Sequence, residues 1–263
     1  MTASPVAQVA SELGIPTVKQ RRFDSPLVEK IATLGADIGV VLAFGALIPG
    51  SALELFPWLN IHFSTLPAWR GASPLQQSML SQTGQGFTIF RLDESMDTGP
   101  TLVVRPLELD ANKPAGELLP ELTELATVEL LERLEGELSF TPQSGSPSYA
   151  PKLTRASARI NFANPADQIH RLVMAMNPEP MAWGELAGNP LRILRSKSLG
   201  STDWNQVSDS QLSPGEIEVS GGKVLVACGG GTRLELIEVQ PAGKKVMSAL
   251  DWARGLQAGA VLG

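Results

Sequence analysis

The sequence predicts an α/β domain with a doubly wound, mostly parallel sheet, followed by a small β-barrel domain. Three observations predict this fold class. Helical and strand-like patterns alternate up to residue 136, which is typical of a parallel sheet covered by helices. The apolar, β-branched run 38–44 is typical of a strand buried on both faces. After residue 151, short strand-like runs separated by turn residues indicate a small barrel or sandwich.

The elements of the first domain are expected from their caps and their periodicity. Ser4 and Ser25 each precede a proline, and this pair commonly opens a helix. Pro120 must lie in the first turns of a long Leu- and Glu-rich helix or kink it. The expected helices cover 4–13, 25–35, 50–55, 73–82 and 114–136, and the expected strands cover 16–19, 38–44, 59–62, 86–92 and 102–107.

A segment rich in Ser, Pro and Gly, residues 141–151, indicates a linker between the domains. We therefore expect the first domain at 1–143, the linker at 144–154 and the second domain at 155–263. The second domain should hold one helix at 165–176. Its expected strands cover 181–187, 190–197, 214–219, 222–228 and 232–239.

Composition narrows the class of protein. With 263 residues, 43% hydrophobic and 18% charged, the chain can bury a core, which excludes global disorder. A single cysteine, Cys228, forms no internal disulfide and suits a reducing cytoplasm. One cysteine and two histidines argue against a structural metal site. The longest apolar run is too short to span a membrane, and the N-terminus lacks a signal-peptide pattern.

Charge is unevenly distributed along the chain. The net charge of −6 argues against a simple basic binder of DNA or other nucleic acid. Residues 151–200 nevertheless carry seven bases against three acids. This stretch could meet a phosphate backbone, or it could be an ordinary solvated face.

The densest group of polar side chains is the segment 60–74, directly after a predicted strand. Ligands of open α/β sheets bind beyond the carboxyl ends of strands. Asn60 and His62 alternate, so their side chains point to the same face of an extended segment. Together an amide and an imidazole can polarise a carbonyl and move a proton. The alternative is a histidine satisfied by backbone groups.

Asp97 lies in a loop after another predicted strand and can face the same crevice. A carboxylate beside His62 would raise the pKa of the imidazole and order a water between them. The alternative is that Asp97 only shapes the turn of the Asp-Thr-Gly-Pro sequence.

Other segments carry weaker signals. Small residues within 44–47 allow close approach of a planar heterocycle, or form an ordinary turn. Trp69 beside Arg70 is a stacking pair or a loop anchor. Lys244 and Lys245 form a basic turn that could touch phosphate or be solvated. Neither a G-x-G-x-x-G motif nor a P-loop is present.

Taken together, these motifs resemble the formyltransferase family that uses 10-formyltetrahydrofolate, and within it the enzymes that act on initiator Met-tRNA. The motifs follow one another in order along essentially the whole chain. They cover 60–62, 64–67, 69–74, 96–100, 149–153, 177–178, 180–183 and 240–247.

The resemblance implies a Rossmann-like first domain, an OB-like tRNA-binding second domain and a reaction. The methionine α-amine would attack the formyl carbon, and N10 of the folate would leave. Asn60 would hydrogen-bond the developing oxyanion, and His62 would assist as acid and base. Asp97 would hold His62 and an ordered water and help to carry the proton.

The resemblance also implies binding residues, no metal and a monomer. The folate co-substrate would contact Phe44, Gly45, Ala46, Leu47, Ser64, Thr65, Leu66 and Pro67. The tRNA would contact Arg70, Lys152, Arg155, Lys244 and Lys245.

The family's first domain opens with a strand, a helix, a second strand and a basic loop, and this sequence starts after them. We therefore expect an N-terminally truncated domain in which 38–44 has an unpaired apolar edge. Two alternatives remain: a formyltransferase for an amino sugar nucleotide, and an inactive remnant that binds folate or tRNA. The intact Asn60, His62 and Asp97 argue against a remnant.

Overall fold

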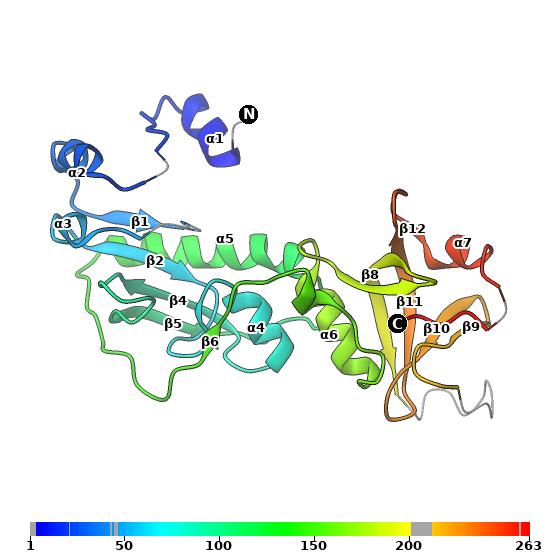
Figure 1. Ribbon diagram of the computed structural model, residues 1–263. Coiled ribbons are helices and arrows are strands. Elements are labelled where there is room, and N and C mark those ends of the chain that lie inside the picture. The colour runs from blue at the N-terminus through cyan, green and yellow to red at the C-terminus, as the bar shows by residue number, and fades with distance from the viewer. Residues whose placement is uncertain (1–3, 21, 43, 45–46, 201–211, 258) are drawn as a thin grey trace.

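The computed structural model describes residues 4–20, 22–42, 44, 47–200, 212–257 and 259–263. The molecule is elongated, with the first domain at one end and the second domain at the other (Figure 1). Helix α5 (Ala115–Leu134) runs along the first sheet, and α6 (Ala166–Met176) lies between the first domain and the second sheet (Figure 1). The linker runs along the side of the first domain before it reaches the second domain (Figure 1).

The first domain contains the predicted alternation of helices and strands. Its other helices are α1 (Pro5–Glu12), α2 (Ser25–Ala32), α3 (Gly50–Leu53) and α4 (Pro74–Ser81). Its strands are β1 (Gly39–Val41), β2 (Trp58–His62), β4 (Gly86–Arg91) and β5 (Thr101–Pro106), with the short β3 (Arg70–Gly71) pairing with β6 (Tyr149–Ala150).

Capping explains where the first two helices begin. The Ser4 hydroxyl accepts a hydrogen bond from the amide of Ala7, as the sequence predicts. At α2 the cap is Asp24, one residue before the expected Ser25. Pro120 lies inside α5, six residues after Pro114, the N-cap. Its place near the start of the helix agrees with the expectation that Pro120 lies in the first turns.

The sheet of the first domain is mixed, with the order β1-β2-β4-β5. The α/β class is confirmed, but the expectation of mostly parallel pairing is wrong. Only β1 and β2 are parallel, whereas β4 is antiparallel to both β2 and β5. The loop between β4 and β5 holds no helix and is too short for a parallel crossover, so the chain must reverse there.

Strand β1 is shorter and more exposed than the sequence predicts. It covers three residues, and the side chains of Val40 and Leu42 are 49% and 43% exposed. Burial on both faces is therefore wrong for the described residues of this run, 38–42 and 44. The reason is position: within the described part of the chain, β1 pairs only with β2 and is the outer strand. The expected strand at 16–19 is irregular, with Val18 exposed and no neighbour to pair with among the described residues.

The second domain holds a helix and an antiparallel sheet. Besides α6, its elements are the short 3-10 helix η1 (Ala156–Ala158), β7 (Ala182–Leu186), β8 (Asn189–Leu199), β9 (Ile217–Ser220), β10 (Lys223–Ala227), β11 (Arg233–Pro241), β12 (Met247–Ser248) and α7 (Ala249–Ala253). The five predicted strands are all present, and β12 and α7 are additional. The strand order is β7-β8-β11-β10-β9, with β12 on β11.

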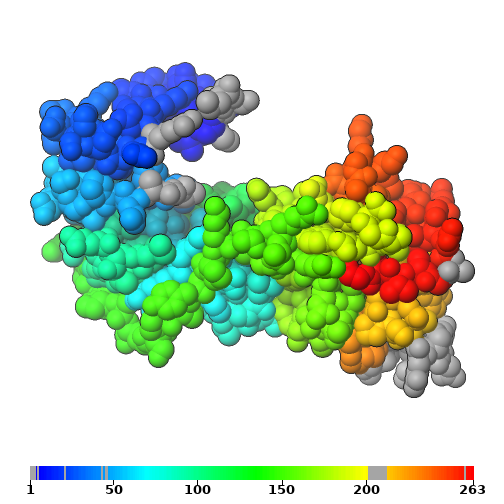
Figure 2. All heavy atoms as spheres, viewed as in Figure 1, coloured from blue at the N-terminus to red at the C-terminus, as the bar shows by residue number. Residues whose placement is uncertain are grey.

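The C-terminal residues bridge the two outer strands of this sheet. Glu185 of β7 exchanges two backbone hydrogen bonds with Gly263, and Ile217 of β9 donates to Ala260. The sheet therefore closes on itself, which agrees with the expected small barrel. Figure 2 shows this domain as a rounded body, with the turn before β12 projecting from it at one end and α1 and α2 projecting at the other end of the molecule.

One hydrophobic core joins the two domains. Leu75 and Met79 of α4 and Leu118 of α5 belong to the same buried cluster as Ile169 and Val173 of α6. Burial of these side chains supplies most of the attraction between the domains. A second, smaller cluster holds α5 on the first sheet; it contains Leu59, Ile61, Phe87, Ile89, Val103, Ala126 and Leu130.

The linker is tied to the first domain where β6 pairs with β3. Arg70 is in register with Tyr149, and Gly71 with Ala150. Gly71 has a φ of +125°, and a Cβ built there would lie 2.4 Å from the carbonyl oxygen of Ala150. Only glycine allows the linker to approach this closely.

Replacing Gly71 with alanine is therefore expected to lower the free energy of unfolding by about 1 to 3 kcal/mol, because of the positive φ and the contact with Ala150. Urea denaturation measures this change. The matched control is Gly136→Ala, because a Cβ at Gly136 meets no atom within 4 Å. Equal effects of the two substitutions would contradict the close approach.

Candidate active site

His62 is held at the end of β2, where its ring is buried and oriented. The imidazole packs edge-to-face on Phe90 of the neighbouring strand, with the ring centroids 6.2 Å apart. Its Nε2 lies 2.9 Å from the carbonyl oxygen of Trp69. Because a carbonyl oxygen only accepts hydrogen bonds, Nε2 carries the proton of the neutral ring. Nδ1 is then unprotonated and free to accept a proton.

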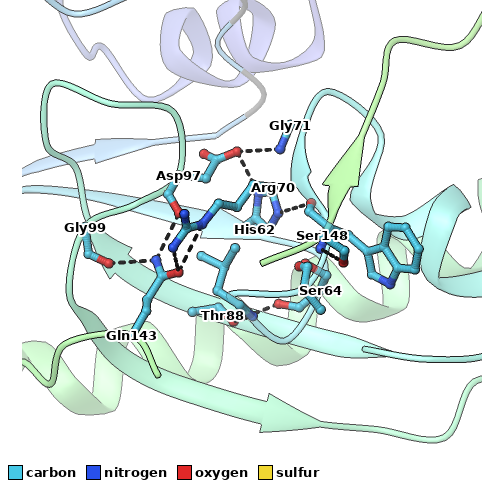
Figure 3. Close-up of polar contacts among 12 residues, drawn as sticks. His62, Ser64, Arg70, Gly71, Thr88, Asp97, Gly99, Gln143 and Ser148 are labelled. Atoms are coloured by element: carbon cyan, nitrogen blue, oxygen red, sulfur yellow. Dashed lines mark hydrogen bonds and ion pairs between the residues drawn. The ribbon is translucent and has the colours of Figure 1, made fainter. Parts of the chain in front are cut away.

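Asp97 faces this free nitrogen from the loop between β4 and β5 (Figure 3). Its Oδ2 lies 3.8 Å from His62 Nδ1 and accepts a hydrogen bond of 2.8 Å from the amide of Gly71. The φ of Asp97 is +55°, a left-handed conformation that aspartate tolerates better than most residues. The structure thus brings together two of the predicted site residues from separate strands.

Burial sets the protonation of His62. Removal from water lowers the pKa of the imidazole below its usual 6.5, while the charge of Asp97 and the carbonyl of Trp69 oppose this shift. The net direction is downward, so the expectation that Asp97 raises the pKa describes only the smaller effect. His62 is therefore neutral at pH 7 and suited to accept a proton.

Asn60 lies two residues before His62 on the same strand and is half-buried. Alternation along β2 puts both side chains on one face. Among the residues that the structure describes, the Asn60 side chain has no hydrogen-bond partner. Its amide N–H groups are therefore available to an oxygen of a bound molecule.

The segment 64–67 is shaped by internal hydrogen bonds. The Ser64 hydroxyl donates to the carbonyl of Ala68 at 2.6 Å, and the Thr88 hydroxyl bridges the carbonyl of Ser64 and the amide of Leu66. Ser64 and Leu66 are buried and hold the loop in place. Their contact with a ligand remains a prediction. Thr65 and Pro67 are the partly exposed members of this segment.

The segment 44–47 is described only in part. Gly45 and Ala46 lie outside the described residues. Phe44 is half-exposed and meets Phe23 edge-to-face, and the Leu47 side chain is exposed. Direct contact of Phe44 and Leu47 with a ligand remains a prediction.

The basic residues expected to contact nucleic acid differ in their surroundings. Arg70 is half-buried, and its Nε and Nη2 both donate to Gln143, so its guanidinium is already engaged within the protein. Lys152, Lys244 and Lys245 are exposed. Arg155 lies over the ring of Trp183, 4.8 Å from its centroid. Contact of these residues with nucleic acid remains a prediction.

Trp69 is a loop anchor, one of the two alternatives for it. Its indole N–H donates to the carbonyl of Thr83 at 2.8 Å, and its backbone amide donates to the Ser148 hydroxyl at 2.9 Å. These bonds fix the carbonyl that orients His62. Ser148 and Gln143 come from the linker segment 141–151, and sequence reasoning missed both because nothing in a loop-rich segment indicates which side chains turn inward.

No cluster of three or more His, Cys, Asp and Glu side chains could hold a metal ion over the described ranges. No helix in the same part of the chain is long and apolar enough to cross a membrane.

Comparison with known protein families decides the family. The protein-family model named "Formyl transferase" matches residues 1–134. The protein-family model named "Formyl transferase, C-terminal domain" matches residues 152–257. The chain belongs to the formyl transferase family. The resemblance inferred from the motifs is thereby confirmed, and the Asn60, His62 and Asp97 cluster lies in the first domain of a formyl transferase.

Individual relatives of this formyl transferase agree. The chain is 38% identical to methionyl-tRNA formyltransferase of Clavibacter michiganensis subsp. michiganensis, over 97% of the chain and 84% of the relative. It is 40% identical to methionyl-tRNA formyltransferase of Acidothermus cellulolyticus, over 96% of the chain and 83% of the relative.

Solved structures share the fold. Methionyl-tRNA formyltransferase from Clostridium thermocellum matches with a TM-score of 0.60 at 17% identity, covering 88% of the chain and 91% of that structure. HypX from Aquifex aeolicus in complex with tetrahydrofolic acid matches with a TM-score of 0.64 at 18% identity, over 88% of the chain and 41% of that structure. At these identities the likeness concerns the fold alone.

The state of His62 gives a pH prediction for this formyl transferase. Proton acceptance requires neutral His62, so kcat/KM should fall as the pH drops through the pKa of His62. Because burial lowers that pKa, the His62 ring should titrate below pH 6.5. NMR titration of the ring measures this directly, and a midpoint above 7 would contradict the assigned state.

Proposed function

We propose that this formyl transferase moves a formyl group from 10-formyltetrahydrofolate to the methionine α-amine of initiator Met-tRNA. The observation that carries the proposal is the similarity to methionyl-tRNA formyltransferases through both domains, at 38% identity over 97% of the chain. The geometry of His62, Asp97 and Asn60 supports the same chemistry.

The proposed reaction uses His62 as the group that moves the proton. As the amine attacks the formyl carbon, a nitrogen–carbon bond forms and Nδ1 of His62 accepts a proton from the amine. When the bond from carbon to N10 breaks, that proton is returned to N10, so the enzyme ends unchanged. The buried imidazole is neutral before the reaction, as this role requires.

Asn60 and Asp97 stabilise the charges that appear. An amide N–H of Asn60 would donate to the formyl oxygen as it becomes negative, and this stabilisation is the larger because the site is partly removed from water. The Asp97 carboxylate, 3.8 Å from Nδ1, stabilises the imidazolium once it has formed.

The folate supplies the formyl group on N10. Two partly exposed residues beside the site, Thr65 and Pro67, are proposed to contact it, as are the exposed Phe44 and Leu47. Ser64 and Leu66 would act indirectly, by holding the loop that carries Thr65 and Pro67. A fold match to a structure titled as a complex with tetrahydrofolic acid agrees with a folate site.

The proposed tRNA contacts are exposed bases of the second half of the chain: Lys152, Arg155, Lys244 and Lys245. Such contacts to phosphates release counterions, so tRNA binding should weaken as salt increases. We place the reaction in the cytoplasm, which the single, buried and unpaired Cys228 suits.

A sugar N-formyltransferase is the second candidate. The protein WlaRD, described as a sugar 3N-formyl transferase, matches with a TM-score of 0.56 at 19% identity over 79% of the chain. That match shows a shared fold alone, whereas the methionyl-tRNA formyltransferase of Clavibacter michiganensis subsp. michiganensis is 38% identical over 97% of the chain. The tRNA substrate is therefore better supported.

The test is a transfer assay with the purified chain. It is given 10-formyltetrahydrofolate and either initiator Met-tRNA or an amino sugar nucleotide. Formylation of Met-tRNA above background is expected. Transfer to the sugar alone would favour the second candidate, and binding of both substrates without turnover would favour an inactive remnant.

A further inference from the structure

Gln143 is one of the few linker residues that turn inward. Its neighbours from Thr141 to Pro147 are exposed, whereas Gln143 is partly buried. Its side chain reaches the loop of Asp97 across 46 residues of sequence. Figure 3 shows it between Arg70 and the backbone at Asp97 and Gly99.

The amide of Gln143 uses both of its ends. Its oxygen accepts from Nε and Nη2 of Arg70 at 3.2 and 2.7 Å. Its nitrogen donates to the carbonyl oxygens of Asp97 and Gly99 at 2.9 and 2.8 Å. A guanidinium only donates and a carbonyl only accepts, so the orientation of the amide is determined by its partners.

These four hydrogen bonds stabilise the loop that carries Asp97, which has an unfavourable backbone conformation and a tightly packed glycine. Asp97 adopts a left-handed φ of +55°, and Gly99 is buried where a Cβ would lie 1.8 Å from the carbonyl of Arg91. Buried carbonyl groups require donors, and Gln143 supplies one to each side of this bend. The carboxylate of Asp97 is thereby kept within 3.8 Å of His62 Nδ1.

We propose that Gln143 is a positioning residue for formyl transfer: its amide bridges Arg70 and the backbone of Asp97 and Gly99 and so keeps the Asp97 carboxylate against His62. This inference rests on the proposed function. It makes the linker segment 141–151, in which Gln143 lies, part of the active site.

Two substitutions test the two ends of the Gln143 amide: the oxygen that accepts from Arg70 and the nitrogen that donates to Asp97 and Gly99. Gln143→Met removes every polar contact while keeping the length of the side chain. Gln143→Glu keeps an acceptor for Arg70 but replaces the donor with an oxygen that faces two carbonyls. If Gln143 acts through the Asp97 loop, both substitutions should lower kcat/KM at least tenfold. Gln168→Glu, at an exposed position of α6, is the control for the added charge and should match the wild type.

A second readout does not depend on turnover. The chain has two histidines, His62 and His170, so selective labelling of histidine gives two ring signals in NMR spectra. Asp97 is the partner in the only ion pair that the described residues make with His62, and Trp69 contributes a carbonyl. Loss of Gln143 should move Asp97 away, so His62 in Gln143→Met should titrate at lower pH, with His170 unchanged.

The outcomes are distinct. Wild-type kcat/KM in Gln143→Glu would overturn the proposal, because the contact with Arg70 would then suffice without the hydrogen bonds to Asp97 and Gly99. An unchanged His62 titration in Gln143→Met would overturn it as well. Failure of the wild-type chain to formylate Met-tRNA would count against the proposed function, while the NMR titration would still test whether Gln143 positions Asp97.

Discussion

Replacing His62 with alanine is expected to lower kcat for formyl transfer by at least about a hundredfold. Nδ1 of His62 is the proposed proton acceptor, and the substitution removes it. Folate affinity should be largely kept, because the expected folate contacts lie in the neighbouring loops. Steady-state kinetics with Met-tRNA and calorimetric titration with the folate measure the two quantities.

His170→Ala is the matched control. His170 is also a buried histidine, but it lies in α6, where its Nδ1 is 3.1 Å from the Ser196 hydroxyl. Its removal should reduce stability and leave kcat of the folded enzyme nearly unchanged. Near-normal turnover in His62→Ala, or equal losses in both variants, would contradict the role of His62.

Replacing Asp97 with alanine is expected to have a similarly large effect, again at least about a hundredfold in kcat. The carboxylate accepts the amide hydrogen of Gly71, and we propose that it also stabilises the imidazolium of His62. Asp97→Asn separates these two roles, because an amide oxygen can still accept from Gly71 but carries no charge. If the charge matters, kcat of Asp97→Asn should be close to kcat of Asp97→Ala.

The pH profile of Asp97→Asn provides the confirming measurement. Without the negative charge, the pKa of His62 loses the main influence that raises it, so the acidic limb should move to lower pH. Asp37→Asn, an exposed aspartate in another loop, controls for charge removal. A normal rate and an unshifted profile in Asp97→Asn would show that Asp97 only shapes its turn.

Local signals predicted most of the elements. Ser4 with Pro5 marked α1 correctly because a side-chain cap acts within four residues. The five strands of the second domain were found because turn residues separate them. Asn60 and His62 were found because they alternate along a strand, and Asp97 because it lies in the loop after the next one. The antiparallel pairing of β2 with β4 puts the carboxyl ends of these strands at opposite edges of the sheet, so the loop after β4 must fold back to bring Asp97 to His62.

Long-range pairing explains the errors. The run 38–44 is as apolar as a central strand, but its burial depends on a neighbour that the described sheet lacks on that side. Ser64 and Leu66 are buried because Thr88 of β4 binds their backbone, a partner that lies outside the segment 64–67. Neither pattern contains the partner that decides the outcome.

The sequence by itself determined the family, the order of the elements and the residue types of the site, since these depend on caps, periodicity and motifs along the chain. Only the tertiary structure decided which nitrogen of His62 is free and which linker side chains enter the site. The carbonyl of Trp69 sets the tautomer, and Gln143 reaches the Asp97 loop from 46 residues away. Hydrogen bonds of this kind are directional and join segments distant in sequence, so they exist only once the chain has folded.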